Sequence, residues 1–192
     1  MLSMRPAFVT LALVAASLPV LAEQMTFVLD AERSEVRIRL GATLHTVPGS
    51  APVGASTLTW DTETGVASGQ VVIQSADLDT GIDARNAKMH DLVLKTLEHP
   101  EISFEATGFE LRQPGTDEMR FVLKGTLTLV GTSHEIELES HARRRGDDSW
   151  KARADLNVPY VEWGLEDPSM ALFGVDKHVA VEVKAIGTLT RE

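Results

Sequence analysis

Apolar and polar side chains alternate along much of this chain. In Glu35-Val36-Arg37-Ile38-Arg39-Leu40 every second residue is aliphatic, and the residues between are charged. A period of two places the aliphatic side chains on one face of a β-strand. Comparable runs occupy residues 66–73, 101–106, 121–129, 135–139 and 179–184. The pattern therefore predicts strands that each present one apolar and one polar face.

Turn-forming residues separate these runs at short intervals, which is typical of antiparallel strands joined by hairpins. The signals are Pro48-Gly49, Thr64-Gly65, Pro114-Gly115, Val130-Gly131-Thr132 and Gly146-Asp147-Asp148. We expect an all-β fold of eight or nine strands, in which a meandering antiparallel sheet closes into a barrel. Closure would leave no strand edge exposed.

Residues 84–99 break the alternation. Their mixture of Ala, Leu, Lys and Glu favours a short helical segment, with Asp83 as its N-cap and Pro100 as its end.

The N-terminus has the layout of a secretory signal peptide. One basic residue, Arg5, precedes the apolar run 6–21, and Val20-Leu21-Ala22 suits a cleavage site. The run is too short to span a bilayer, which needs about 20 apolar residues, although a signal anchor is the alternative interpretation. We expect cleavage after Ala22 and an exported, soluble domain of residues 23–192.

Charge narrows the range of partners. The chain has 18 basic and 28 acidic side chains, a net charge of −10, and loss of Arg5 with the signal peptide makes the balance more negative. Nucleic acid is an unsuitable partner because phosphate binding needs a basic surface, and docking on anionic lipid headgroups is disfavoured for the same reason. Since the chain has no cysteine, its stability must come from apolar burial rather than from disulfides.

No catalytic or metal-binding motif stands out. The six histidines show no paired spacing suited to zinc, and there is no nucleophile elbow or phosphate-binding glycine loop. His45, near the expected barrel mouth, and His90 are the residues that an enzyme or metal site would use. Residues 143–145, three arginines, are most simply a charged hairpin tip, with partner docking as the alternative.

Four motifs resemble the YceI-like family, in the order found there. They are Thr80-Gly81-Ile82 with Arg85-Asn86 and Met89; His99-Pro100-Glu101-Ile102-Ser103-Phe104; the run 125–132; and Trp163-Gly164-Leu165-Glu166-Asp167-Pro168-Ser169. The resemblance implies an extended lipocalin-like barrel with a small helix and an elongated apolar cavity. It also implies a periplasmic location and a polyisoprenoid ligand, such as an isoprenoid quinone. His90-Asp91 and Trp163 depart from the usual pattern.

Together these observations predict a binding protein rather than an enzyme, without metal or cofactor, that encloses an apolar lipid for carriage, storage or stress response. A strand of ten residues is about 33 Å long, so an eight-stranded barrel can hold one extended tail. A barrel filled by its own side chains and a small-molecule enzyme are the alternatives, and the sequence leaves open whether the protein forms a homodimer. The expected ligand-facing residues are Val36, Ile38, Leu40, Phe104, Phe121, Leu123, Leu127, Leu129, Val181 and Val183.

Overall fold

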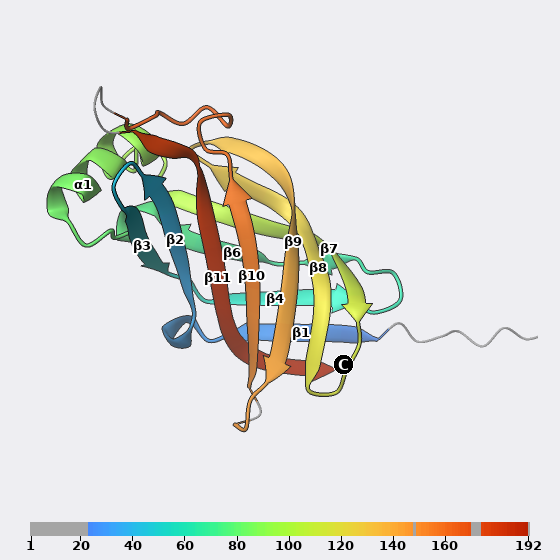
Figure 1. Ribbon diagram of the computed structural model, residues 1–192. Helices are drawn as coiled ribbons and strands as arrows, with labels where there is room; N and C mark the ends of the chain where they lie inside the picture. The colour runs from blue at the N-terminus through green and yellow to red at the C-terminus, as the bar shows by residue number, and fades with distance from the viewer. Residues whose placement is uncertain (1–22, 148, 170–173, 192) are drawn as a thin grey trace, which may run out of the picture.

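A computed structural model describes residues 23–147, 149–169 and 174–191, which fold into a nearly closed antiparallel barrel (Figure 1). The predicted signal peptide, residues 1–22, lies outside the described residues. The strands are β1 (Gln24–Leu29), β2 (Glu35–Ala42), β3 (Thr46–Pro52), β4 (Ser56–Asp61), β5 (Ala67–Ser68), β6 (Gln70–Gln74), β7 (Glu101–Gln113), β8 (Glu118–Leu129), β9 (Thr132–Arg144), β10 (Trp150–Val158) and β11 (Val175–Arg191).

The all-β antiparallel barrel with one short helix is therefore confirmed. The described sheet has eleven strands where eight or nine were expected. One reason is that the run 66–73 divides at Gly69, whose φ of 126° interrupts the strand and separates β5 from β6. Glycine adopts this backbone angle without steric penalty.

Long hairpins connect β7 to β10 as the turn signals predicted. Val130 and Gly131 join β8 to β9 with φ of 49° and 73°, as a two-residue hairpin with both central residues at positive φ requires. Pro114-Gly115 lies in the turn between β7 and β8. These hairpins set the register that places alternate side chains inside the barrel.

Pro48-Gly49 is not a turn, contrary to the sequence-based prediction, but lies within β3. β3 pairs only with β2 in the sheet and is therefore an edge strand. Proline is tolerated in an edge strand because no second neighbour requires its missing N–H.

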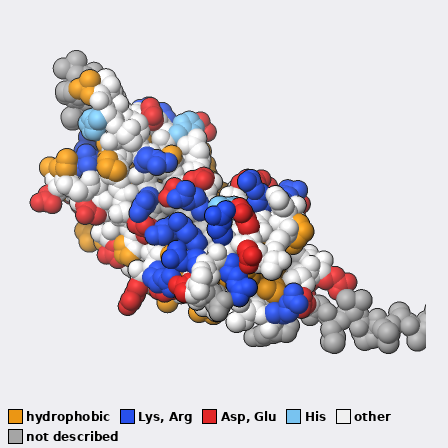
Figure 2. Space-filling model, turned by 60° about the horizontal axis from the view of Figure 1, so that its bottom comes forward, with side chains coloured by type: hydrophobic (Ala, Val, Ile, Leu, Met, Phe, Trp, Pro, Cys, Tyr) orange, Lys and Arg blue, Asp and Glu red, His pale blue; other side chains and the backbone are white. Residues whose placement is uncertain are grey.

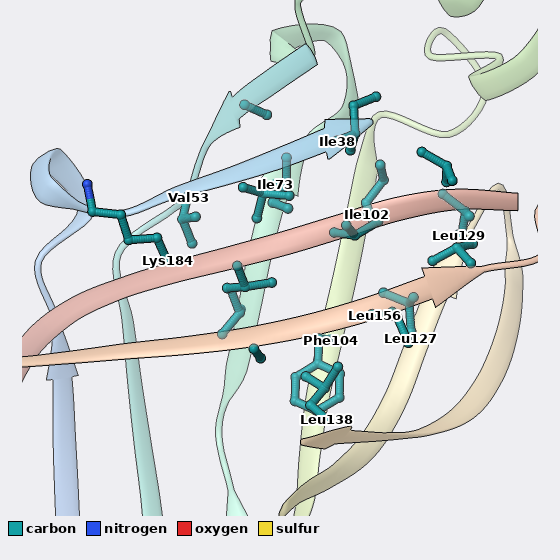
Figure 3. Close-up of a pocket in the computed structure, with 18 of the residues that line it drawn as sticks. Ile38, Val53, Ile73, Ile102, Phe104, Leu127, Leu129, Leu138, Leu156 and Lys184 are labelled. Carbon is teal, nitrogen blue, oxygen red and sulfur yellow. The ribbon is translucent and has the colours of Figure 1, made fainter. Parts of the chain in front are cut away.

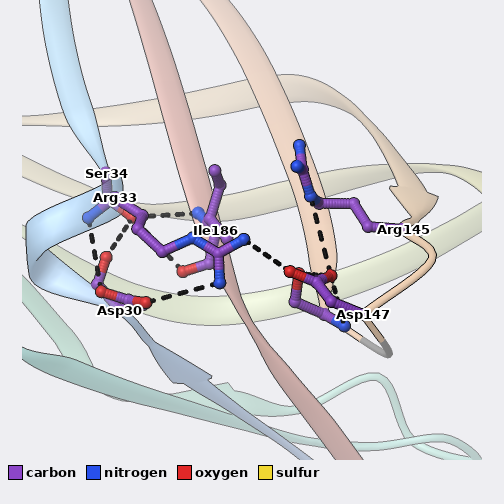
Figure 4. A network of polar contacts seen from close by, with 7 residues as sticks. Asp30, Arg33, Ser34, Arg145, Asp147 and Ile186 are labelled. Carbon is purple, nitrogen blue, oxygen red and sulfur yellow. Dashed lines mark hydrogen bonds and ion pairs between the residues drawn. The ribbon is translucent and has the colours of Figure 1, made fainter.

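The C-terminal strand β11 changes partners along its length. On one side, residues 179–187 pair with β10; on the other, residues 175–184 pair with β2 and residues 187–191 pair with β1. Between these segments the buried Ser34 Oγ accepts a hydrogen bond from Ile186 N at 2.9 Å and donates to Asp30 O at 2.7 Å (Figure 4). This side chain replaces the missing strand partner.

The short 3₁₀ turn η1 (Ala31–Arg33), which precedes Ser34, is joined to the β9–β10 hairpin. Arg33 lies 2.8 Å from Asp147, which also contacts Arg145 (Figure 4). These groups are exposed, so the ion pairs orient the loop but add little stability.

Where the β4–β5 segment meets β6 and β7, isolated hydrogen bonds take the place of a continuous ladder. Phe109 N donates to Gly65 O at 2.7 Å, and Gly54 N donates to Val72 O at 2.9 Å. A bridge between Val66 and Gly108 adds to them. These contacts bring the β4–β5 segment against β6 and β7 and nearly complete the ring.

The helical segment lies at one end of the barrel (Figure 1). It comprises α1 (Asp83–Lys88) and a π-helical turn, Met89–Leu94, after which Lys95 has a left-handed φ of 48°. The segment therefore ends before the predicted His99, because the left-handed residue closes the helix. Asp83 is the first helical residue and Ile82 the N-cap, so the predicted capping role of Asp83 is wrong. In the described residues no helix has the length and apolarity needed to cross a membrane.

Candidate ligand-binding cavity

The barrel encloses an apolar cavity of about 680 Å³. Ile38, Ile73 and Ile102 enter it from β2, β6 and β7, and Leu129, Leu138 and Leu156 enter from β8, β9 and β10 (Figure 3). Its volume falls within the range of small-molecule binding sites. The barrel interior is therefore not filled by its own side chains, and the alternative of a packed structural core is wrong.

All ten residues expected to face a ligand lie on the wall of this cavity. They are Val36, Ile38, Leu40, Phe104, Phe121, Leu123, Leu127, Leu129, Val181 and Val183. Their contact with a ligand stays a prediction. Their common placement follows from the two-residue period: Leu127 points inward, while the outward-facing Thr126 donates a hydrogen bond to Glu135 at 2.7 Å.

Stacked aromatic rings line the end of the cavity away from α1. The ring of Phe109 lies 4.5 Å from that of Trp60 and 4.8 Å from that of Phe121, measured between centroids. Offset stacking of this kind stabilises aromatic clusters. Trp60 and Trp150 both belong to the cavity wall.

Polar groups reach the cavity wall at the α1 end. Asn86 Oδ1 accepts hydrogen bonds from both the N and Oγ1 of Thr80, at 2.9 and 2.6 Å. Arg85 donates to Thr80 Oγ1 and O, and Lys88 donates to Pro168 O at 2.8 Å. Thr80, Arg85 and Lys88 all line the cavity.

Sequence reasoning did not select these polar residues as site residues. Their signal was present in the motif Thr80-Gly81-Ile82…Arg85-Asn86, but alternation carries no information about side chains on a loop and a helix. Arg85 and Lys88 both donate hydrogen bonds to uncharged oxygens, and neither side chain forms a salt bridge within the described residues. They can therefore still interact with a polar group at this end of the cavity.

The only tyrosine of the chain, Tyr160, also belongs to the α1 end of the wall. It is buried, and its hydroxyl donates to Asp176 O at 2.9 Å. Burial, followed by the nearby carboxylates of Asp167 and Asp176, raises the pKa of Tyr160 to about 12. The side chain is therefore a neutral hydrogen-bond donor over the whole physiological range.

The histidines of the described residues do not belong to a metal-binding cluster. His45 is exposed at the cavity wall, whereas the buried Nδ1 of His90 has no hydrogen-bond partner. Across the described ranges no three His, Cys, Asp or Glu side chains lie close enough to hold a metal ion. Asp79 bonds to Gly81 N and Asn86 Nδ2, which lower the pKa of its carboxyl, so its role here is to position the loop.

The sequence pattern of the YceI-like domain family matches residues 27–186. Among curated proteins the search found no match.

Solved structures share the fold at low sequence identity. Burkholderia cenocepacia BcnA is 14% identical, with a TM-score of 0.69, over 83% of this chain and 99% of that one. A polyisoprenoid-binding domain from Saccharophagus degradans, implicated in plant cell wall breakdown, is 18% identical, with a TM-score of 0.66, over 84% and 97%. A Campylobacter jejuni YceI protein is 16% identical, with a TM-score of 0.54, over 75% and 86%.

Proposed function

The chain belongs to the YceI-like family, and on that premise we propose that its barrel binds the apolar chain of an isoprenoid lipid, such as a polyprenyl chain or an isoprenoid quinone. The observation that carries the proposal is the cavity of about 680 Å³ with an almost wholly aliphatic and aromatic wall. The similar Saccharophagus degradans structure is a polyisoprenoid-binding domain, which supports the same ligand class.

Apolar burial alone supplies enough affinity. Enclosing about 500 Å² of a lipid tail contributes roughly 12 kcal/mol at ~25 cal/mol per Å². Association costs at least about 4 kcal/mol, and the remaining ~8 kcal/mol corresponds to micromolar binding. Such a site retains a long hydrocarbon without any reaction, as carriage or storage requires.

The two ends of the cavity suggest how the lipid lies. Trp60, Phe109 and Phe121 surround the end away from α1 with apolar rings. Arg85 and Lys88 supply hydrogen-bond donors at the α1 end. We therefore place the tail among the rings and the polar head beside α1.

The proposed compartment is the periplasm. It rests on the signal-peptide pattern of residues 1–22 and on the family's usual location.

Lipid extraction tests the binding function directly. Protein purified from its native host is extracted with organic solvent, and the extract is analysed by mass spectrometry. We expect one isoprenoid lipid in near-stoichiometric amount. Protein that carries no such lipid and does not take up added isoprenoid quinone contradicts the proposal.

A further inference from the structure

Cations gather on one outer face of this acidic protein. Figure 2 shows Lys and Arg side chains spread across that face, where they outnumber the acidic side chains that lie among them. The face is formed by the outward-pointing residues of β8, β9, β10 and β11 together with η1 and the β9–β10 hairpin. We define it as the basic face: Arg33, Arg120, His141, Arg143, Arg145, Lys151, Arg153 and Lys184.

Strand register places these basic side chains directly beside one another. Arg153 pairs with Lys184 across β10 and β11, and Arg143 pairs with Lys151 across β9 and β10. His141 lies between Arg120 and Arg153 in the same row. Like charges opposite each other on a sheet are destabilising.

Some outward pairs on the rest of the barrel join opposite charges, whereas Asp155 on β10 lies opposite Glu182 on β11. Lys124 on β8 pairs with Glu137 on β9, with 3.3 Å between the charged atoms, and Arg37 pairs with Glu182. Pairs of neighbouring cations, Arg153 with Lys184 and Arg143 with Lys151, therefore characterise the basic face.

Four described carboxylates, Glu35, Glu118, Asp147 and Glu182, contact the basic face and offset only part of the charge of its seven Lys and Arg side chains. Arg153 contacts Glu182, and Arg143 contacts Glu118. In each pair the cation is the more exposed group: 43% against 14% for the first pair and 68% against 46% for the second. Glu35 and Asp147 also neutralise part of the charge, through Lys184 and Arg33. Arg120 and Lys151 make no salt bridge with any described residue.

We propose that the basic face docks the protein reversibly on a bilayer with anionic headgroups. This rests on the proposed function, because an isoprenoid lipid must be taken from or delivered to a membrane. The face spans four neighbouring strands, about 14 Å at ~4.8 Å per strand, which allows several headgroups to be contacted together. From the sequence, the net charge of −10 made such docking unfavourable. Salt screens charges that lie more than about 10 Å away, so the charges of the face that contacts the membrane dominate the interaction.

An acidic protein is the less suitable partner. Specific protein interfaces are organised around buried apolar or aromatic anchors. The large exposed apolar side chains among the described residues are Val28, Leu44, Val66, Ile82, Leu92, Leu97 and Leu111, and none of them lies on β8 to β11. A surface that offers charge without an apolar anchor suits headgroups better.

Vesicle flotation tests the proposal with the purified protein. We expect binding to phosphatidylcholine vesicles that contain one third phosphatidylglycerol, no binding to pure phosphatidylcholine, and loss of binding as salt rises. The double variant Arg120→Glu/Lys151→Glu breaks no described salt bridge. Each cation near an anionic surface contributes about fivefold in affinity, so this variant should bind at least ~25-fold more weakly.

The matched control is Arg39→Glu/Lys95→Glu, which makes the same change in net charge at exposed positions outside the basic face. It should bind the anionic vesicles as the wild type does. Equal binding of the two double variants overturns the proposal, as does wild-type binding to pure phosphatidylcholine. The proposal is also overturned if the protein binds an acidic protein and fails to bind anionic vesicles.

The amount of isoprenoid lipid carried by each protein distinguishes a failure of the docking proposal from a failure of the proposed lipid-binding function. The double variant should still carry its isoprenoid lipid when the cavity is intact. Wild-type protein that carries lipid but ignores anionic vesicles refutes only the docking face, whereas protein that binds vesicles but never carries lipid refutes only the cavity function.

Discussion

The ring of Phe104 on β7 lies directly over Gly125 on β8. A Cβ atom at residue 125 would lie 2.6 Å from Cζ of Phe104 and would also clash with the carbonyl oxygen of Glu105. An aromatic ring that covers a glycine on the neighbouring strand shields the bare backbone of the sheet. Gly187 on β11 and Phe27 on β1 repeat the arrangement. These glycines let the rings lie flat against the wall and leave the centre of the barrel open.

Gly125→Ala should therefore destabilise the protein by about 1–3 kcal/mol, because the new methyl group forces the ring and the neighbouring strand to move. Urea unfolding measures the change. Gly146→Ala is the control, since a Cβ there meets no atom within 4 Å, and it should leave the midpoint unchanged. If the wild type, Gly125→Ala and Gly146→Ala unfolded at the same urea concentration, the contact between Phe104 and residue 125 would not exclude a side chain.

Phe104→Trp should reduce lipid loading while the fold is retained. The larger ring narrows the cavity without introducing charge, and overpacking typically costs about 1–3 kcal/mol. The measurement is the molar ratio of extracted lipid to protein, with circular dichroism as the test of folding. Glu105→Trp is the matched control, because Glu105 is exposed and next to Phe104 on the outer face of the same strand. A folded Phe104→Trp variant with full lipid content would mean that the tail does not lie beside this residue.

Ser34→Ala should cost about 1–3 kcal/mol, because it leaves the buried N–H of Ile186 without a partner. Hydrogen exchange at the Ile186 amide should accelerate more than exchange in β8. Ser133→Ala, at an exposed serine bonded to Thr128, should change neither quantity appreciably. Unaltered exchange at Ile186 would show that another group replaces the hydroxyl.

Alkaline titration should detect the raised pKa of Tyr160. Its folded-state pKa of about 12 lies above the ordinary value of 10.0, so the folded protein binds a proton that the unfolded chain has lost. The stability from this group is complete below pH 10 and is lost as the pH rises towards 12. Because the chain has one tyrosine, tyrosinate absorbance reports this group alone. A midpoint near 10 in the native protein, or an equally steep alkaline loss of stability in Tyr160→Phe, would contradict the assignment.

Export predicts a defined N-terminus. Protein recovered from the periplasm should begin at Glu23, because the bond after Ala22 suits signal peptidase. Intact mass spectrometry decides this. A mass that retains residues 1–22 would indicate an anchored protein instead.

Alternation explains why much of the barrel and its wall could be predicted from the sequence. In β2, β8 and β11 the two-residue period alone separates inward from outward side chains. The strong turn residues at Gly65 and Gly131 then position the strand ends, and both have positive φ. The strand part of the cavity wall could be predicted for the same reason, because almost all inward side chains of the strands are apolar.

Features that depend on strand partners could not be predicted in the same way. Pro48 is compatible with β3 only because that strand is an edge, and Arg143 meets Lys151 only through the β9–β10 register. Arg85 and Lys88 reach the cavity from a helix whose placement depends on Thr80 and Asn86. Each case requires knowledge of which distant segments become neighbours.

The partner change along β11 has a consequence for the order of folding. The meander β7 to β10 consists of hairpins between neighbouring strands, whereas β1 and β11 join residues as far apart as Thr26 and Thr190, 164 positions along the chain. Local pairs form quickly, and pairs that close long loops form slowly. The four-stranded meander is therefore expected to form before the N-terminal strands attach through β11. Until that late step the future cavity is an open apolar trough, accessible along its whole length to a lipid or to another unfolded chain.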